Sequence, residues 1–166
     1  MKYLKITILA ISFLLSKKVT FSQNARINIL TQKAGIVKKG KKLFLEISIT
    51  NTDHTDFIGI YKLKVQINLP SEIASIDTAG IILPTGWKIL DANEASMIIS
   101  NGMDMIAATD DRNIMLSIRG KKMGGPLTIT GYLSFADGTE PGNKPGALKN
   151  DLAGDNNSTT TCTVTK

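Results

Sequence analysis

Hydrophobic and polar residues alternate one by one over much of this chain. The pattern is clearest in four runs, at residues 43–50, 61–69, 113–119 and 127–135. Successive side chains of a β-strand point to opposite faces, so each run predicts a strand with one buried and one solvent-facing side. Burial of a single face is typical of antiparallel sheets and not of parallel sheets covered by helices.

Turn-forming residues separate these runs. The Asn101-Gly102 pair predicts a tight hairpin between strands at 94–100 and 103–108. The other turn signals are Asp110-Asp111, Gly124-Gly125-Pro126 and Pro84-Thr85-Gly86, the last of them before a short strand at 87–91.

Two more strands are expected at 26–31 and 158–165, which brings the total to eight or nine. No apolar stripe with helical spacing extends beyond two turns after residue 22. We therefore expect an all-β fold, namely an immunoglobulin-like antiparallel β-sandwich with Greek-key connections. The length of 166 residues suits a single domain.

The N-terminus has the pattern of a signal peptide at residues 1–22. Lys2 and Lys5 precede ten apolar residues at 6–15, and small residues around Ser22 suit cleavage before Gln23. Ten residues rise only about 15 Å as a helix, so a stable membrane span is not expected. The alternative is a buried N-terminal strand or helix. The first interpretation predicts a secreted or extracytoplasmic domain at 23–166.

Removal of the leader changes the charge of the protein. The leader contains four lysines, and their loss lowers the formal net charge from +6 to +2. An excess of two positive charges is too small to indicate binding of nucleic acid. One dense basic cluster is left, with Lys38, Lys39, Lys41 and Lys42 around Gly40. It is either a solvated turn or a contact for an anionic glycan or lipid.

Cys162 is the only cysteine, so no disulfide can form within the chain. An export signal with almost no cysteine favours a bacterial periplasmic or cell-surface protein. Cys162 alternates with Thr160 and Val164, which favours a buried thiol. Pairing between two chains is the alternative.

Residues 137–157 are rich in glycine, proline, asparagine and aspartate, and predict a long loop before the last strand. Asp151, Asp155 and Asn157, together with Asn156, supply the oxygen ligands that calcium prefers. Their spacing matches no EF-hand, and the same residue types are common in turns. No other cofactor is expected.

Signals for catalysis are absent, and we expect a protein that is not an enzyme. His54 is the only histidine and falls in a polar turn, away from any expected nucleophile. One histidine and one cysteine cannot form a zinc site of the usual spacing.

Binding of a glycan would need an aromatic platform. Trp87 and Tyr132 are the candidate ligand residues, since Tyr61 is in phase with core positions. Tyr132 falls on the solvent-facing side of its run, whereas Trp87 is equally suited to anchor the core.

Several segments resemble the DUF11-type bacterial surface repeat, an immunoglobulin-like module of adhesin-like and cell-wall proteins. The similar stretches are ISITNT at 47–52, INLPSEI at 67–73, LPTGWKI at 83–89 and GDNNSTTTCTVTK at 154–166. Such modules usually occur in tandem, and this chain contains one. The resemblance implies a role at the cell surface.

Together these features predict a non-catalytic exported module that takes part in adhesion or in contacts with an envelope or extracellular protein. The alternative is a small carbohydrate-binding module.

Overall fold

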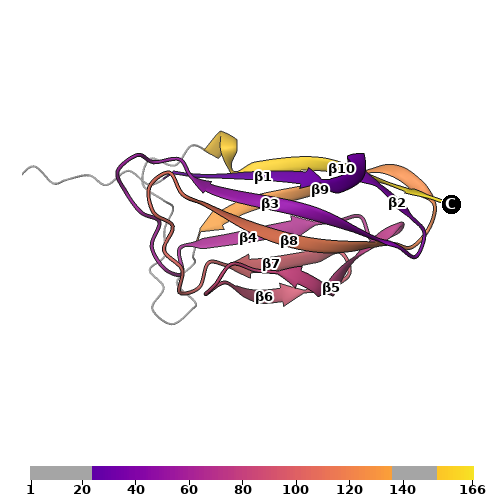
Figure 1. Ribbon diagram of the computed structural model, residues 1–166, viewed down its shortest axis with the longest axis horizontal. Helices are drawn as coiled ribbons and strands as arrows, with labels where there is room; N and C mark the ends of the chain where they lie inside the picture. Colours follow the sequence, from indigo (N-terminus) through magenta and orange to yellow (C-terminus); the bar gives the residue numbers. More distant parts are fainter. Residues whose placement is uncertain (1–23, 136–152) are drawn as a thin grey trace, which may run out of the picture.

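A computed structural model describes residues 24–135 and 153–166, and the strands in these ranges form two packed sheets (Figure 1). The four-stranded sheet has the order β1 (Ala25–Thr31), β3 (Lys42–Asn51), β8 (Asp111–Gly120) and β5 (Ala74–Ile82). The six-stranded sheet has the order β2 (Ile36–Lys38), β10 (Asn157–Thr165), β9 (Gly124–Phe135), β4 (Leu63–Asn68), β7 (Ser96–Ser100) and β6 (Lys88–Ala92). Two short 3₁₀ turns, η1 (Gln32–Gly35) and η2 (Ala153–Asp155), complete the secondary structure of these ranges.

The chain crosses repeatedly between the two sheets. The consecutive strands β3 and β4 lie in different sheets, and so do β8 and β9, so most neighbours within a sheet are distant in sequence. All strand pairs are antiparallel except β2 with β10. This arrangement confirms the expected immunoglobulin-like β-sandwich. The strands of the described ranges number ten, against the eight or nine expected.

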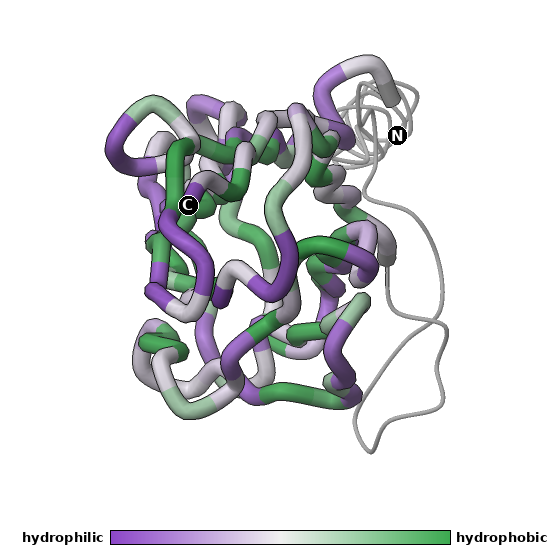
Figure 2. The backbone as a smooth tube through the Cα atoms, turned by 90° about the vertical axis from the view of Figure 1, so that its right-hand side faces the viewer, coloured by the Kyte–Doolittle hydropathy of each residue, from purple (hydrophilic) through white to green (hydrophobic). Residues whose placement is uncertain are grey.

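The buried side chains come from the predicted alternation. Every second residue of β3 is buried, and the same holds for β4 and for the middle of β8. Figure 2 views the sandwich end-on and shows hydrophobic and hydrophilic stretches alternating along the chain. The core contains Leu43, Leu45, Ile47, Ile49, Leu63, Val65, Ile67, Ile114, Leu116 and Ile118, together with Met97, Ile99, Ile129, Cys162 and Val164.

β1 and β2 are consecutive strands that lie in opposite sheets. The chain changes sheet at η1, after which β2 pairs with the end of β10. The backbone N–H of Ile29 in β1 donates a 3.0 Å hydrogen bond to Ser158 Oγ in β10, which joins the two sheets along this side.

Two of the predicted turns differ in the structure: a turn is present at Asn101-Gly102 but joins no hairpin, and the turn expected at 124–126 lies earlier in the chain. Residues 103–108 form no strand beyond a single bridge between Ile58 and Ile106, so Asn101-Gly102 does not connect a hairpin. Gly124, Gly125 and Pro126 lie inside β9, and the turn precedes them at 121–123. In both places the chain passes from one sheet to the other, which a local turn pattern does not reveal.

The strand β5 was not expected. It pairs with β8 up to Asp77, leaves the register, and resumes at Ile82 opposite Met115. This irregularity breaks the alternation that marks the other strands.

The predicted signal peptide at 1–22 lies outside the described residues, as does most of the loop at 137–157. Of that loop, residues 153–155 form η2, and Asn157 already belongs to β10. The part of the chain that the structure describes contains no helix with the length and apolar character needed to span a bilayer.

Candidate binding surfaces

Trp87 lies in the core, with only 7% of its surface exposed. Its indole Nε1 donates a 2.7 Å hydrogen bond to Asp104 Oδ2, and the same oxygen accepts a 2.7 Å hydrogen bond from Arg112 Nε. The hydrogen bond and ion pair with Asp104 raise the pKa of Arg112. Trp87 therefore anchors the loops at this end of the sandwich and does not offer its ring as a platform for a sugar.

Tyr132 has 44% of its surface exposed, on the outer face of the six-stranded sheet. In the sheet register it lies between Gln66 of β4 and Asn157 of β10. The neighbouring outward positions are polar, with Thr128 and Thr130 on the same strand. The result is a flat polar face with an exposed tyrosine.

The residues predicted to bind calcium are only partly described. Asp155 lies in η2 and Asn157 begins β10, while Asp151 lies outside the described residues. Within residues 24–135 and 153–166, no group of three or more His, Cys, Asp or Glu side chains is placed to hold a metal ion. Calcium binding stays a prediction.

Cys162 is a free thiol and is 1% exposed. Burial raises the pKa of this thiol, so it packs as a small apolar side chain and is not placed to meet a second chain. His54 is exposed in the loop between β3 and β4. In that loop Asp53 Oδ1 accepts hydrogen bonds from the backbone N–H groups of Thr55 (2.8 Å) and Asp56 (2.9 Å).

An apolar stripe crosses the outer face of the four-stranded sheet. In register, Leu30 of β1 lies opposite Glu46 of β3, Glu46 opposite Met115 of β8, and Met115 opposite Ile82 of β5. Leu30 and Ile82 are 56% and 64% exposed, and Phe44 beside Glu46 is 36% exposed. We call Leu30, Phe44, Ile82 and Met115 the apolar stripe. The sequence contained part of this signal, because Phe44 and Met115 are apolar residues at outward positions.

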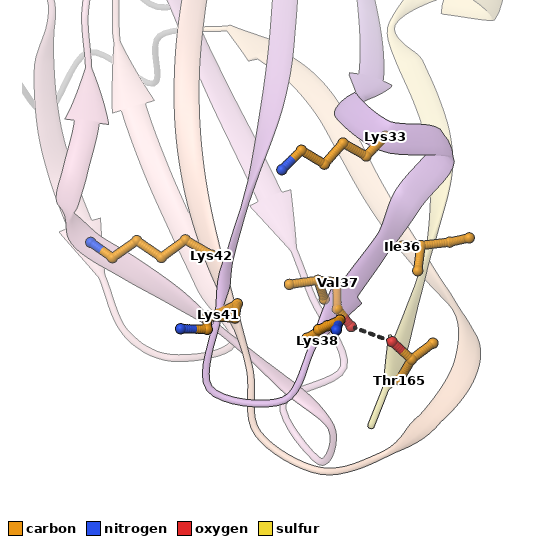
Figure 3. A pocket seen from close by; sticks show the side chains of 7 residues that line it. All are labelled: Lys33, Ile36, Val37, Lys38, Lys41, Lys42 and Thr165. Carbon is orange, nitrogen blue, oxygen red and sulfur yellow. Dashed lines mark hydrogen bonds between the residues drawn. The ribbon is translucent and has the colours of Figure 1, made fainter.

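A hollow of about 400 Å³ lies at the end of the sandwich where β2 and β10 meet. We call it the basic hollow, and Figure 3 shows its lining, which consists of Lys33, Ile36, Val37, Lys38, Lys41, Lys42 and Thr165. The sequence cluster at 38–42 supplies three of the lysines. Lys33 joins them from η1, and Thr165 joins them through the pairing of β2 with β10.

Lys42 is neutralised by a carboxylate at the edge of the basic hollow. Its Nζ lies 2.7 Å from Asp77 Oδ2, and Arg119 Nη2 lies 3.2 Å from the same atom. The hydrogen bond from Lys42, together with that from Arg119, lowers the pKa of Asp77. Asp77 therefore stays ionised under all but strongly acidic conditions.

The comparisons with known proteins identify the class of fold. No family model matches the chain, and no curated protein matches it by sequence. Solved structures do match. The CARDB domain of the PF1109 protein from Pyrococcus furiosus has a TM-score of 0.50 at 11% identity, over 91% of this chain and 96% of that one. A cohesin module from a family 33 glycoside hydrolase of Clostridium perfringens has a TM-score of 0.52 at 11% identity, over 87% and 98%.

The major pilin subunit BcpA of Bacillus cereus, in its D312A form, has a TM-score of 0.54 at 13% identity. The match covers 87% of this chain but 41% of the pilin, so it involves one part of that subunit. At these identities the likeness shows the fold alone. The chain is an immunoglobulin-like sandwich of the kind found in cohesin, CARDB and pilin modules, and the resemblance to the DUF11 repeat stays a prediction.

Proposed function

We propose that the protein is an exported, non-catalytic module that binds an envelope or extracellular protein through the apolar stripe. The exposure of Leu30 and Ile82 on one flat sheet carries this proposal. Contiguous exposed apolar side chains with a polar surround mark protein-binding surfaces. Export is supported by the signal-peptide pattern at 1–22. The fold is shared with a cohesin module and with part of a major pilin subunit, which favours a role in binding or assembly.

The stripe also indicates the chemistry of its partner. Glu46 lies in the middle of the row, between Leu30 and Met115. A partner that covered the stripe with apolar side chains alone would bury this carboxylate without a counter-charge, which is costly. We therefore expect an apolar partner surface with one lysine or arginine facing Glu46.

The Leu30→Ser/Ile82→Ser double variant tests this face. Loss of these two apolar contacts is expected to weaken binding by about 2 kcal/mol, which is roughly 30-fold in Kd. The measurement is recovery of envelope proteins on the tagged full chain, followed by titration of the recovered partner. The matched control is Thr130→Ala/Thr159→Ala on the opposite sheet. A partner that binds both variants equally well does not use the stripe, and the proposal would then fail.

A carbohydrate-binding module is the second candidate, and the exposed ring of Tyr132 favours it. The hydroxyl groups of a sugar stacked on this ring could form hydrogen bonds with the side chains of Gln66 and Asn157 on the two neighbouring strands.

The Tyr132→Ala variant tests the second candidate on a glycan array. We expect the affinity for any glycan bound by the wild type to fall about tenfold, because the stacking surface is lost. Phe44→Ala removes an exposed ring from the other sheet and serves as the control. Silence of the wild type on the array would exclude this candidate.

A further inference from the structure

The backbone that leads into the basic hollow is strained. Lys33 and Ala34 have φ angles of 51°, and Gly35 follows at 73°. Left-handed residues that carry side chains are energetically unfavourable, and two of these three consecutive residues do so. Such strain is kept where a local geometry serves a purpose, and here the turn holds Lys33 over the hollow (Figure 3).

The lysines of the basic hollow are not balanced by acids. Asp77 pairs with Lys42 and Arg119, as described above. No carboxylate among the described residues lies within 4 Å of the amines of Lys33, Lys38 or Lys41. Three ammonium groups around one concavity create a positive potential that attracts anions.

Part of the lining is aliphatic. Ile36 is 52% exposed, although it belongs to a strand, and Val37 lines the hollow beside it. The volume of about 400 Å³ falls within the range of roughly 300–1,000 Å³ that is usual for small-ligand sites. A ligand for this site therefore combines negative groups with a compact apolar surface.

The concave shape and the lining of the hollow favour one class of anionic partner over others. A bilayer is flat and cannot fill a concavity, whereas a polymer chain can enter it. Single-stranded nucleic acids are held in part by stacking on aromatic rings, and no aromatic residue lines the hollow. The hollow is also lined by lysines and not by the planar forks of arginine that grip single phosphates in a bidentate manner. Flexible point charges suit the spaced carboxylates or sulfates of a polysaccharide.

We propose that the basic hollow binds an acidic polysaccharide, with the amines of Lys33, Lys38 and Lys41 contacting its carboxylate or sulfate groups and Ile36 packing against a sugar ring. This site is separate from the apolar stripe and from Tyr132. It gives the module a second means of attachment, which does not depend on a protein partner.

The Lys33→Gln/Lys38→Gln/Lys41→Gln variant of the full chain tests the site. The probes are polygalacturonate for carboxylates, dextran sulfate for sulfates and uncharged dextran, titrated by calorimetry in 50 mM and 500 mM NaCl. We expect the wild type to bind one or both charged polymers and not dextran, with weaker binding at high salt because the charges are screened. The variant is expected to lose on the order of 100-fold in affinity, because three charges that face the polymer are removed.

The matched control is Lys62→Gln/Lys64→Gln/Lys88→Gln, which removes the same charge from the other end of the sandwich. There Leu63 pairs with Phe135, whereas the hollow lies near the pairing of Gly124 with Val164. Retained affinity in the control supports the site. Equal losses in both variants would reveal a general charge effect and overturn the proposal. Failure of the wild type to bind either polymer would also overturn it, as would stronger binding to phosphatidylglycerol vesicles or to polyglutamate. Melting temperatures show whether the variants are folded. No change is expected for the exposed Lys33, Lys38 and Lys41. A small decrease is expected for the control, because Lys62 and Lys64 are half-buried and Lys88 lies 5.1 Å from the centre of the Tyr61 ring.

Discussion

Replacement of Asn101 by alanine is expected to lower the free energy of unfolding by about 4 kcal/mol. Asn101 is completely buried. Its Oδ1 accepts a 3.0 Å hydrogen bond from the backbone N–H of Leu63, and its Nδ2 donates to the carbonyl oxygens of Gly59 (2.9 Å) and Asp104 (2.8 Å). Alanine would leave these three backbone groups without partners, at about 1–3 kcal/mol for each. The same side chain thus ties the start of β4 to the loop after β7.

Urea denaturation followed by tryptophan fluorescence measures this effect, because Trp87 is the single tryptophan and binds Asp104. Asn93→Ala is the matched control. The Oδ1 of Asn93 also accepts two backbone hydrogen bonds, from Ala95 and Ser96, but on the surface, where water replaces them. We expect a loss of about 1 kcal/mol or less there. Equal losses of unfolding free energy in the two variants would contradict the view that burial makes the hydrogen bonds of Asn101 important for stability.

The strands that follow strict alternation could be predicted from the sequence. Within β3 and β8 the inward positions at 43–49 and 114–118 all hold large aliphatic side chains. The local order of residues is therefore enough to predict which face is buried. The outward position of Tyr132 follows from the same rule. These features need no knowledge of which strands are neighbours.

The features that depend on distant neighbours could not be predicted. The Asn101-Gly102 pair has the local pattern of a hairpin turn. The Asn101 side chain nevertheless forms a hydrogen bond with Gly59, which lies in the loop from β3 of one sheet to β4 of the other. From the sequence alone, Trp87 could lie either in the core or on the surface. The structure places it in the core, with Asp104 beside its indole. The apolar stripe combines residues from four strands, and the basic hollow combines Lys33 with Thr165. Pairing between strands that are distant in sequence creates the stripe, and the pairing of Lys38 with Thr165 brings the two sides of the hollow together. Alternation does not encode either of them.

Replacement of Gly35 by alanine is expected to destabilise the protein by about 3 kcal/mol. The φ angle of 73° places this residue in the left-handed region, which costs about 1 kcal/mol or more for alanine. A Cβ atom at Gly35 would also collide with the backbone carbonyl oxygen of Thr161 in β10. Since no side-chain rotation can move a backbone oxygen, η1 and β10 must separate, and shifts of this kind cost about 1–3 kcal/mol.

Gly40→Ala separates the two contributions to this effect. Gly40 has nearly the same φ angle, 77°, but a Cβ atom there would meet nothing within 4 Å. Its replacement is expected to cost only the conformational part, about 1 kcal/mol, in the same urea experiment. The difference between the two losses of unfolding free energy measures the cost of the collision between η1 and β10. Equal losses would show that the two segments move apart at no cost. Because η1 also carries Lys33, Gly35→Ala is further expected to weaken polysaccharide binding at the basic hollow. If the variant folds and binds the polysaccharide as tightly as the wild type, the left-handed turn does not position this lysine.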